Sequence, residues 1–141
     1  MEIPESARKV IESGRLVHVV TVNRDGSPQV SIVWAGLEGE EIVFASFSDN
    51  HKLRNMRRDP RVSLSIETDN FNAAGLQEYL VVHGMASVTE GGAGDVLQRL
   101  AYTYIGPDVG KFPPGDGPTP PGFVVHVMPT RFSGVGPWTV S

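Results

Sequence analysis

The residues best suited to chemistry in this chain are polar and basic side chains gathered between Ser46 and Arg61. Residues 51–61 hold five basic residues against a single acidic one, Asp59. Ser46 and Ser48 come directly before them. Serine hydroxyls, a lysine amine and an arginine guanidinium are the groups that bind a phosphate through charge-assisted hydrogen bonds. We therefore predict that this stretch binds a small anion, and a phosphate group fits it best.

A short helix is needed to position these side chains. Ser48, Asp49 and Asn50 are good N-cap residues and Pro60 ends the segment, so we expect a helix over residues 50–58. The free N–H groups of its first turn also favour an anion. The side chains expected to serve this anion site from the helix are His51, which opens it, and Lys52, Asn55 and Arg58 on successive turns.

The rest of the chain reads as a mostly β domain. Runs of β-branched and apolar residues predict six strands, over residues 16–23, 29–36, 41–47, 61–68, 78–89 and 123–132. A short helix is expected over residues 3–13, and a longer one from an N-cap at Thr89 to Ile105. The first four strands follow one another as a meander, so we expect one antiparallel sheet that closes into a small barrel, as a single domain over residues 1–141.

Residues 106–122 contain six prolines and five glycines, so they form neither a helix nor the interior of a sheet. We interpret them as a long surface loop. Loops of this length often serve as lids or binding loops, and a loop that covers the anion site would determine substrate choice. An insertion without a function is the alternative.

Composition excludes several classes of function. The chain carries a net charge of −4, which does not suit a protein that binds nucleic acid. It has no cysteine, no histidine at a metal-ligand spacing, no nucleophile elbow and no catalytic pair of carboxylates. We therefore expect no metal and no catalytic side chain, so that a cofactor carries any chemistry. No apolar run reaches the roughly 18 residues of a membrane span, and no signal peptide is present, which predicts a cytoplasmic protein.

The stretch Lys52-x-x-Asn55-x-x-Arg58-Asp59-Pro60-Arg61-Val62-Ser63-Leu64 resembles the signature of the pyridoxamine 5′-phosphate oxidase-like split-barrel superfamily of flavin and deazaflavin proteins. The hairpin over residues 21–31, Val33-Trp34, Gly84 and the tail over residues 129–138 also resemble that superfamily. The resemblance covers nearly the whole chain. It implies a six-stranded antiparallel split β-barrel with flanking short helices, and a homodimer with two cofactor sites at the interface.

Within the superfamily, the chain looks most like the short proteins that use the deazaflavin coenzyme F420. The resemblance implies that Lys52, Asn55 and Arg58, with Arg57 nearby, approach the cofactor phosphate. It also implies that Gln29, Val30 and Ser31 line the ring, that Ser46, Phe47 and Ser48 lie beneath it, and that Trp138 closes the pocket from the second subunit.

The chain also departs from the FMN-dependent oxidases of the superfamily. They carry Arg-x-x-Leu-Leu-Lys where this chain has the base-free stretch 31–34, and their C-terminal arginines have no counterpart beyond Arg131. The leading hypothesis is therefore an F420-dependent oxidoreductase that transfers a hydride to an unsaturated small molecule of quinone, enone or tetrapyrrole type. The alternatives are an FMN-dependent reductase or oxidase on the same scaffold, and a protein that binds F420 or flavin without turnover.

Overall fold

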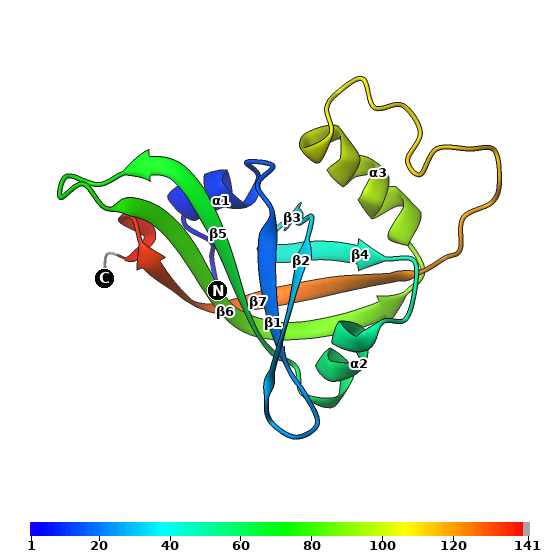
Figure 1. The fold of residues 1–141 in the computed structure, drawn as a ribbon, viewed down its shortest axis with the longest axis horizontal. Coiled ribbons are helices and arrows are strands. Elements are labelled where there is room, and N and C mark those ends of the chain that lie inside the picture. Colours follow the sequence, from blue (N-terminus) through cyan, green and yellow to red (C-terminus); the bar gives the residue numbers. More distant parts are fainter. Residues whose placement is uncertain (140–141) are drawn as a thin grey trace.

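The computed structural model describes residues 1–139, and these residues form one curled β-sheet with helices at its ends and edges (Figure 1). In chain order the described elements are α1 (Glu5–Ile11), β1 (Val17–Val22), β2 (Pro28–Val33), β3 (Gly36–Glu38), β4 (Glu41–Ser46), α2 (His51–Arg58), β5 (Arg61–Phe71), β6 (Gln77–Glu90), α3 (Ala93–Tyr104), β7 (Phe123–Val135) and the short 3-10 helix η1 (Pro137–Thr139).

Within residues 1–139 the sheet has seven strands in the order β2-β1-β5-β6-β7-β4-β3, and every pairing is antiparallel. The two outermost strands, β2 and β3, are consecutive in the chain and yet do not pair with each other. The sheet therefore curls towards closure but stays open along this line, as expected for a split barrel. We call this opening the split.

The prediction of six strands is wrong by one, because residues 29–36 do not form a single strand. The chain leaves β2 at Trp34 and begins the three-residue β3 at Gly36. Between them, the backbone N–H of Ala35 donates to the hydroxyl of Tyr104 at 3.0 Å, and that hydroxyl lies 3.2 Å from the carbonyl oxygen of Ala35. A tertiary contact thus satisfies the backbone groups that a continuous strand would have paired with a neighbouring strand.

The predicted N-cap of α3 at Thr89 is also wrong. Strand β6 continues to Glu90, and Gly91 and Gly92 then turn the chain with φ angles of 88° and 82°, which favour glycine. Gly92 occupies the N-cap position. Helix α3 packs against β4, and a Cβ atom at Gly36 would lie only 2.9 Å from Leu100, so the helix approaches the sheet closely there.

The core lies inside the curl of the sheet. Alternate residues of β5, namely Val62, Leu64 and Ile66, point inward and are almost fully buried, as are Leu80 and Val82 of β6. This alternation follows from the two-residue repeat of a strand. None of the helices within residues 1–139 combines the length and the apolar character that crossing a membrane requires.

Candidate functional site

A cleft lies beside the split, at the point where β3 begins. Strand β3 pairs only with the first half of β4, and its last partner there is Val43. The end of β4 therefore borders the cleft together with the end of β2. The cleft has a volume of about 450 Å³, and we call it the split cleft. Its lining residues are Leu16, Ile32, Val33, Trp34, Ala45, Ser46, Phe47, Lys52, Leu97, Phe112 and Pro113.

Lys52 is the one charged residue that lines the split cleft. Its side chain is half-buried, and this desolvation lowers the pKa of the Lys52 amine. No ion pair or hydrogen bond to this amine is formed within residues 1–139. A desolvated ammonium group without a counter-charge costs free energy, and a bound anion would offset that cost. The split cleft is thus suited to a ligand with one anionic group and an otherwise apolar body.

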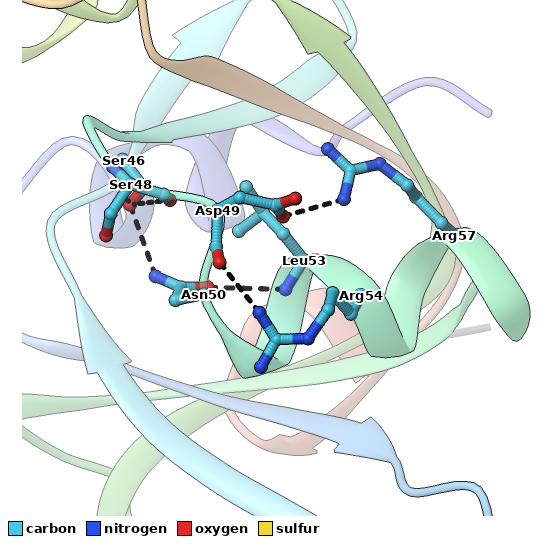
Figure 2. A network of polar contacts seen from close by, with 7 residues as sticks. All are labelled: Ser46, Ser48, Asp49, Asn50, Leu53, Arg54 and Arg57. Carbon is cyan, nitrogen blue, oxygen red and sulfur yellow. Dashed lines mark hydrogen bonds and ion pairs between the residues drawn. The ribbon is translucent and has the colours of Figure 1, made fainter.

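The start of α2 is fixed to the end of β4 by a network of short-range hydrogen bonds (Figure 2). The Asn50 side chain accepts from the backbone N–H of Leu53 at 3.3 Å, so Asn50 is the N-cap among the three predicted candidates, and it donates to the hydroxyl of Ser46 at 3.2 Å. The Ser46 hydroxyl in turn donates to the carbonyl of Ser48 at 2.7 Å. This network fixes the first turn of α2, and hence Lys52, relative to β4.

Asp49 extends the network to the next turns of the helix. Its carboxylate pairs with Arg57 at 2.7 Å, and its carbonyl accepts from Arg54 at 2.8 Å (Figure 2). The guanidinium of Arg57 also lies over the ring of Phe123, 5.2 Å from its centroid. Arg57 is therefore engaged by an acidic and an aromatic partner of its own chain.

Asn55 and Arg58, which the sequence assigned to the phosphate, hold α2 against β1. Asn55 is 2% exposed, and its amide donates to the Thr21 hydroxyl at 3.0 Å and to the Asn23 side chain at 2.9 Å. Arg58 donates to the carbonyl of Val22 and to the Asn55 side-chain oxygen.

His51 lies on the same side of α2 as these two residues, with its Nε2 atom 2.8 Å from the side-chain oxygen of Asn23. The three residues belong to a second cleft of about 520 Å³ at the β1–β2 hairpin. This hairpin cleft is lined by Asn23, Arg24, Asp25, His51, Arg54, Asn55 and Arg58. The structure thus brings Lys52 together with Ser46 and Phe47 and places His51, Asn55 and Arg58 at the other cleft.

The three predicted ring-lining residues of β2 alternate between the two faces of the sheet. Val30 is 60% exposed on the outer face. Gln29 and Ser31 point to the inner face, where Gln29 accepts a hydrogen bond from Thr21 at 2.9 Å. The Ser31 hydroxyl oxygen is buried and has no hydrogen-bond partner within residues 1–139. Ser31 itself does not line the split cleft, although the next two residues, Ile32 and Val33, do.

Neither Ser48 nor Trp138 lines the split cleft. The Ser48 side chain is exposed, and the Ser48 backbone belongs to the network of Figure 2 through its bonds to Ser46. Trp138 is 6% exposed in the core of its own chain, and its indole N–H donates to the carbonyl of Ser133 at 2.8 Å. Little of the Trp138 surface is therefore available to a second subunit.

Of the residues that line the split cleft, sequence reasoning assigned only Ser46, Phe47 and Lys52 to a site, and Trp34, Phe112 and Leu97 are among those it missed. Trp34 stacks on Tyr104 with ring centroids 5.3 Å apart, and Phe112 lies 5.3 Å from Trp34 in a tilted arrangement. Leu97 reaches the cleft from α3. The helical apolar stripe and the conspicuous loop over residues 106–122 were the available signals, but neither shows which residues face the split.

Residues 3–133 match the protein family described as pyridoxamine 5′-phosphate oxidase. The chain belongs to this family. The solved structure of a protein named F420 reductase is 29% identical, has a TM-score of 0.73, and is matched over 93% of this chain and 98% of that one. A comparison with curated proteins gave no match.

Two more distant structures share the family's fold. A conserved hypothetical protein from Mycobacterium tuberculosis is 22% identical, with a TM-score of 0.69 over 94% of this chain and 84% of that one. A FAD-binding protein from Mesorhizobium loti is 20% identical, with a TM-score of 0.62 over 94% of each chain. These two likenesses concern the fold alone. They agree with the mostly β, antiparallel split barrel expected from the sequence.

Proposed function

We propose that the protein is an oxidoreductase that binds coenzyme F420 in the split cleft and reduces an unsaturated small molecule of quinone, enone or tetrapyrrole type. The observation that carries the proposal is Lys52, a half-buried amine that has no counter-charge within residues 1–139 and lies among otherwise uncharged lining residues. The 29% identity to the protein named F420 reductase supports the deazaflavin over a flavin.

The residues of the split cleft fit a phosphate-bearing ring. Lys52 and the first turn of α2 would hold the phosphate, and the Ser46 hydroxyl would anchor that turn to the end of β4. Trp34 and Phe47 supply apolar surface for the body of the ring. When bound, the coenzyme supplies the hydride.

The chain's own contribution is to orient the reactants and to exclude water. Leu97, Trp34 and Phe112 surround the inner part of the cleft with apolar groups, so water is displaced when a ligand enters. Lys52 is the only titratable side chain among the residues that line the split cleft, and it would be engaged by the phosphate. Solvent therefore supplies the proton that the reduced substrate takes up.

Titration of the purified protein with oxidised coenzyme F420 and with FMN, followed by fluorescence quenching, tests the proposal. We expect micromolar or tighter binding of F420. In Lys52→Met the affinity should fall by about tenfold to a hundredfold, since one charge-assisted hydrogen bond contributes roughly 1.5–3 kcal/mol. Lys9→Met, which removes an exposed charge on α1, is the matched control and should bind normally.

Each alternative outcome has a distinct meaning. Binding of FMN alone would assign the protein to the FMN-dependent members of the family. Binding of neither cofactor would overturn the proposal. Tight F420 binding without oxidation of the reduced coenzyme by quinones, enones or tetrapyrroles would indicate a binding protein without turnover.

We also propose that the protein is a homodimer with a cofactor site near each end of the subunit interface. Apolar side chains on the outer face of the sheet support this, because Val30, Ile32, Met85 and Met128 are each more than two-fifths exposed. The proposed partners are the small-molecule substrate and this second subunit. Location in the cytoplasm stays a prediction from the sequence.

A further inference from the structure

Two aromatic rings, those of Trp34 and Phe112, line the split cleft, and the ring of Tyr104 stacks on Trp34. Trp34 stacks on Tyr104 with an interplanar angle of 13° and contacts Phe112 at an angle of 48°. Tyr104 is immobilised because its hydroxyl accepts from the N–H of Ala35 at 3.0 Å and donates to the carbonyl of Arg15 at 2.8 Å. Two of the rings, those of Trp34 and Tyr104, are therefore fixed by the sheet and by α3.

The third ring, that of Phe112, belongs to the Gly/Pro-rich segment 106–122, which arcs away from α3 before it returns to β7 (Figure 1). One side chain of α3 fixes this part of the segment. The amide of Gln98 donates to the carbonyl of Gly110 at 2.7 Å, and its oxygen accepts from the backbone N–H of Phe112 at 2.7 Å. The backbone on both sides of Lys111 is thus bound by a single glutamine.

The same segment makes few other polar contacts with the domain near this point. Lys111 donates to the carbonyl of Gly115 at 2.6 Å, which is a contact within the segment. Phe112 and Pro113 nevertheless line the split cleft, whereas the other lining residues lie on or next to the sheet, α2 and α3. The width of the cleft on this side therefore depends on the two hydrogen bonds of Gln98.

We propose that Gln98 is a positioning residue that holds Phe112 against Trp34, and that Phe112 thereby makes the cleft selective for flat, uncharged ring systems. This inference rests on the proposed function for the reaction, but the positioning of Phe112 is a property of the protein alone. Aromatic side chains contact planar rings in offset or edge-to-face arrangements and offer nothing comparable to a small aliphatic substrate.

A spectroscopic experiment tests the positioning without any cofactor. The chain has two tryptophans, so Trp138→Phe leaves Trp34 as the only indole emitter. In that background, Gln98→Met keeps the length and helix propensity of the side chain but removes both hydrogen bonds. We expect the Trp34 emission to shift to longer wavelength and its quenching by acrylamide to increase.

The matched control is Asp116→Asn, an exposed change in the same segment that should leave the spectrum unaltered. An emission spectrum of Gln98→Met identical to that of the parent would overturn the positioning role.

Selectivity is tested with a bicyclic and a small acceptor, 2-methyl-1,4-naphthoquinone and 2-cyclohexen-1-one. With reduced coenzyme F420 as donor, Gln98→Met and Phe112→Ala should each raise the KM of the naphthoquinone about fivefold or more, while the KM of cyclohexenone changes less than about twofold. Equal losses for both acceptors would overturn the selectivity, because they would indicate general damage to the cleft.

Failure of the proposed function is recognised separately. If F420 does not bind, quenching of Trp34 by the naphthoquinone alone still measures occupation of the cleft, with Trp34→Phe as the control for light absorbed by the quinone. If the naphthoquinone quenches Trp34 less strongly in Phe112→Ala than in the parent protein, the inference of a ring-selective cleft stands even though F420 does not bind. No saturable quenching in the parent protein would overturn it.

Discussion

At the scale of single residues, Lys52 should show opposite effects on stability and on binding. Replacing it by methionine removes a desolvated charge, so Lys52→Met should unfold at a higher urea concentration than the parent protein in the absence of ligand. The same change should weaken binding of a phosphate-bearing cofactor. Exposed Lys9→Met is the control and should leave both quantities unchanged. A lower urea midpoint for Lys52→Met would contradict our account of the site.

The effect of Lys52 on stability should also depend on pH. Burial lowers the pKa of Lys52 from its ordinary value of 10.5 in the folded protein. Between the folded and unfolded pKa values the unfolded chain binds more protons, so the penalty from Lys52 decreases as the pH rises through this window. Urea unfolding at neutral pH and near pH 10.5 should therefore show the stability advantage of Lys52→Met shrinking at the higher pH. An advantage that grows with pH would mean that the Lys52 charge is stabilised in the fold.

Asn55 allows a structural role to be separated from a ligand role. Its amide is buried and donates to Thr21 and Asn23, so Asn55→Ala leaves buried partners unsatisfied. We expect a loss of about 2–3 kcal/mol in the free energy of unfolding, measured by chemical denaturation. Cofactor affinity, measured below the unfolding transition, should change less than about threefold. A large loss of affinity at unchanged stability would instead place Asn55 at the phosphate.

At the scale of elements, the junction of β4 and α2 depends on the two functions of the Asn50 side chain (Figure 2). Asn50→Ala should reduce the free energy of unfolding by about 1 kcal/mol, the usual contribution of an N-cap. Asn50→Asp keeps the acceptor for Leu53 but loses the donor to Ser46, so its stability should be close to that of the parent, whereas its cofactor affinity should fall. Equal stabilities of Asn50→Ala and Asn50→Asp in denaturant titrations would argue against the cap.

The elements predicted correctly are those whose signals are local. Asn50 is recognisable as an N-cap from its neighbours, and the β-branched alternation of β5 and β6 needs no distant partner. The break between β2 and β3 could not be predicted, because it depends on the hydroxyl of Tyr104, 69 residues along the chain from Ala35. The place of Phe112 in the lining of the split cleft could not be predicted for the same reason. It depends on tertiary hydrogen bonds from Gln98.

Helical geometry explains why only part of the basic cluster reaches the split cleft. Residues three apart on a helix are offset by about 60° around the axis, so Lys52 and Arg58 lie about 120° apart. Lys52 therefore lines the split cleft, while Arg58 lines the hairpin cleft. The sequence predicts an anion site in this segment, but side-chain spacing alone does not divide the segment between two clefts.

At the scale of the whole molecule, the apolar side chains exposed on the outer face of the sheet have no explanation within a single chain. In the register of the sheet, Met85 lies directly opposite Met128, and Val20 lies opposite Val30. Met85 and Met128 are 43% and 54% exposed, and Val30 is 60% exposed. Association of two such faces would remove these apolar side chains from water, which is the main favourable contribution to forming a dimer.

We therefore expect Met128→Glu to convert the proposed dimer to a monomer at micromolar concentration, because it introduces an unpaired carboxylate into the apolar contact. Size-exclusion chromatography with light scattering gives the molar mass directly. Ile105→Glu, at a 55% exposed position at the end of α3, is the matched control and should remain dimeric. Since the proposed cofactor sites lie near the interface, Met128→Glu should also lose F420 affinity. A parent protein that is monomeric under these conditions would contradict both the dimer and its part in cofactor binding.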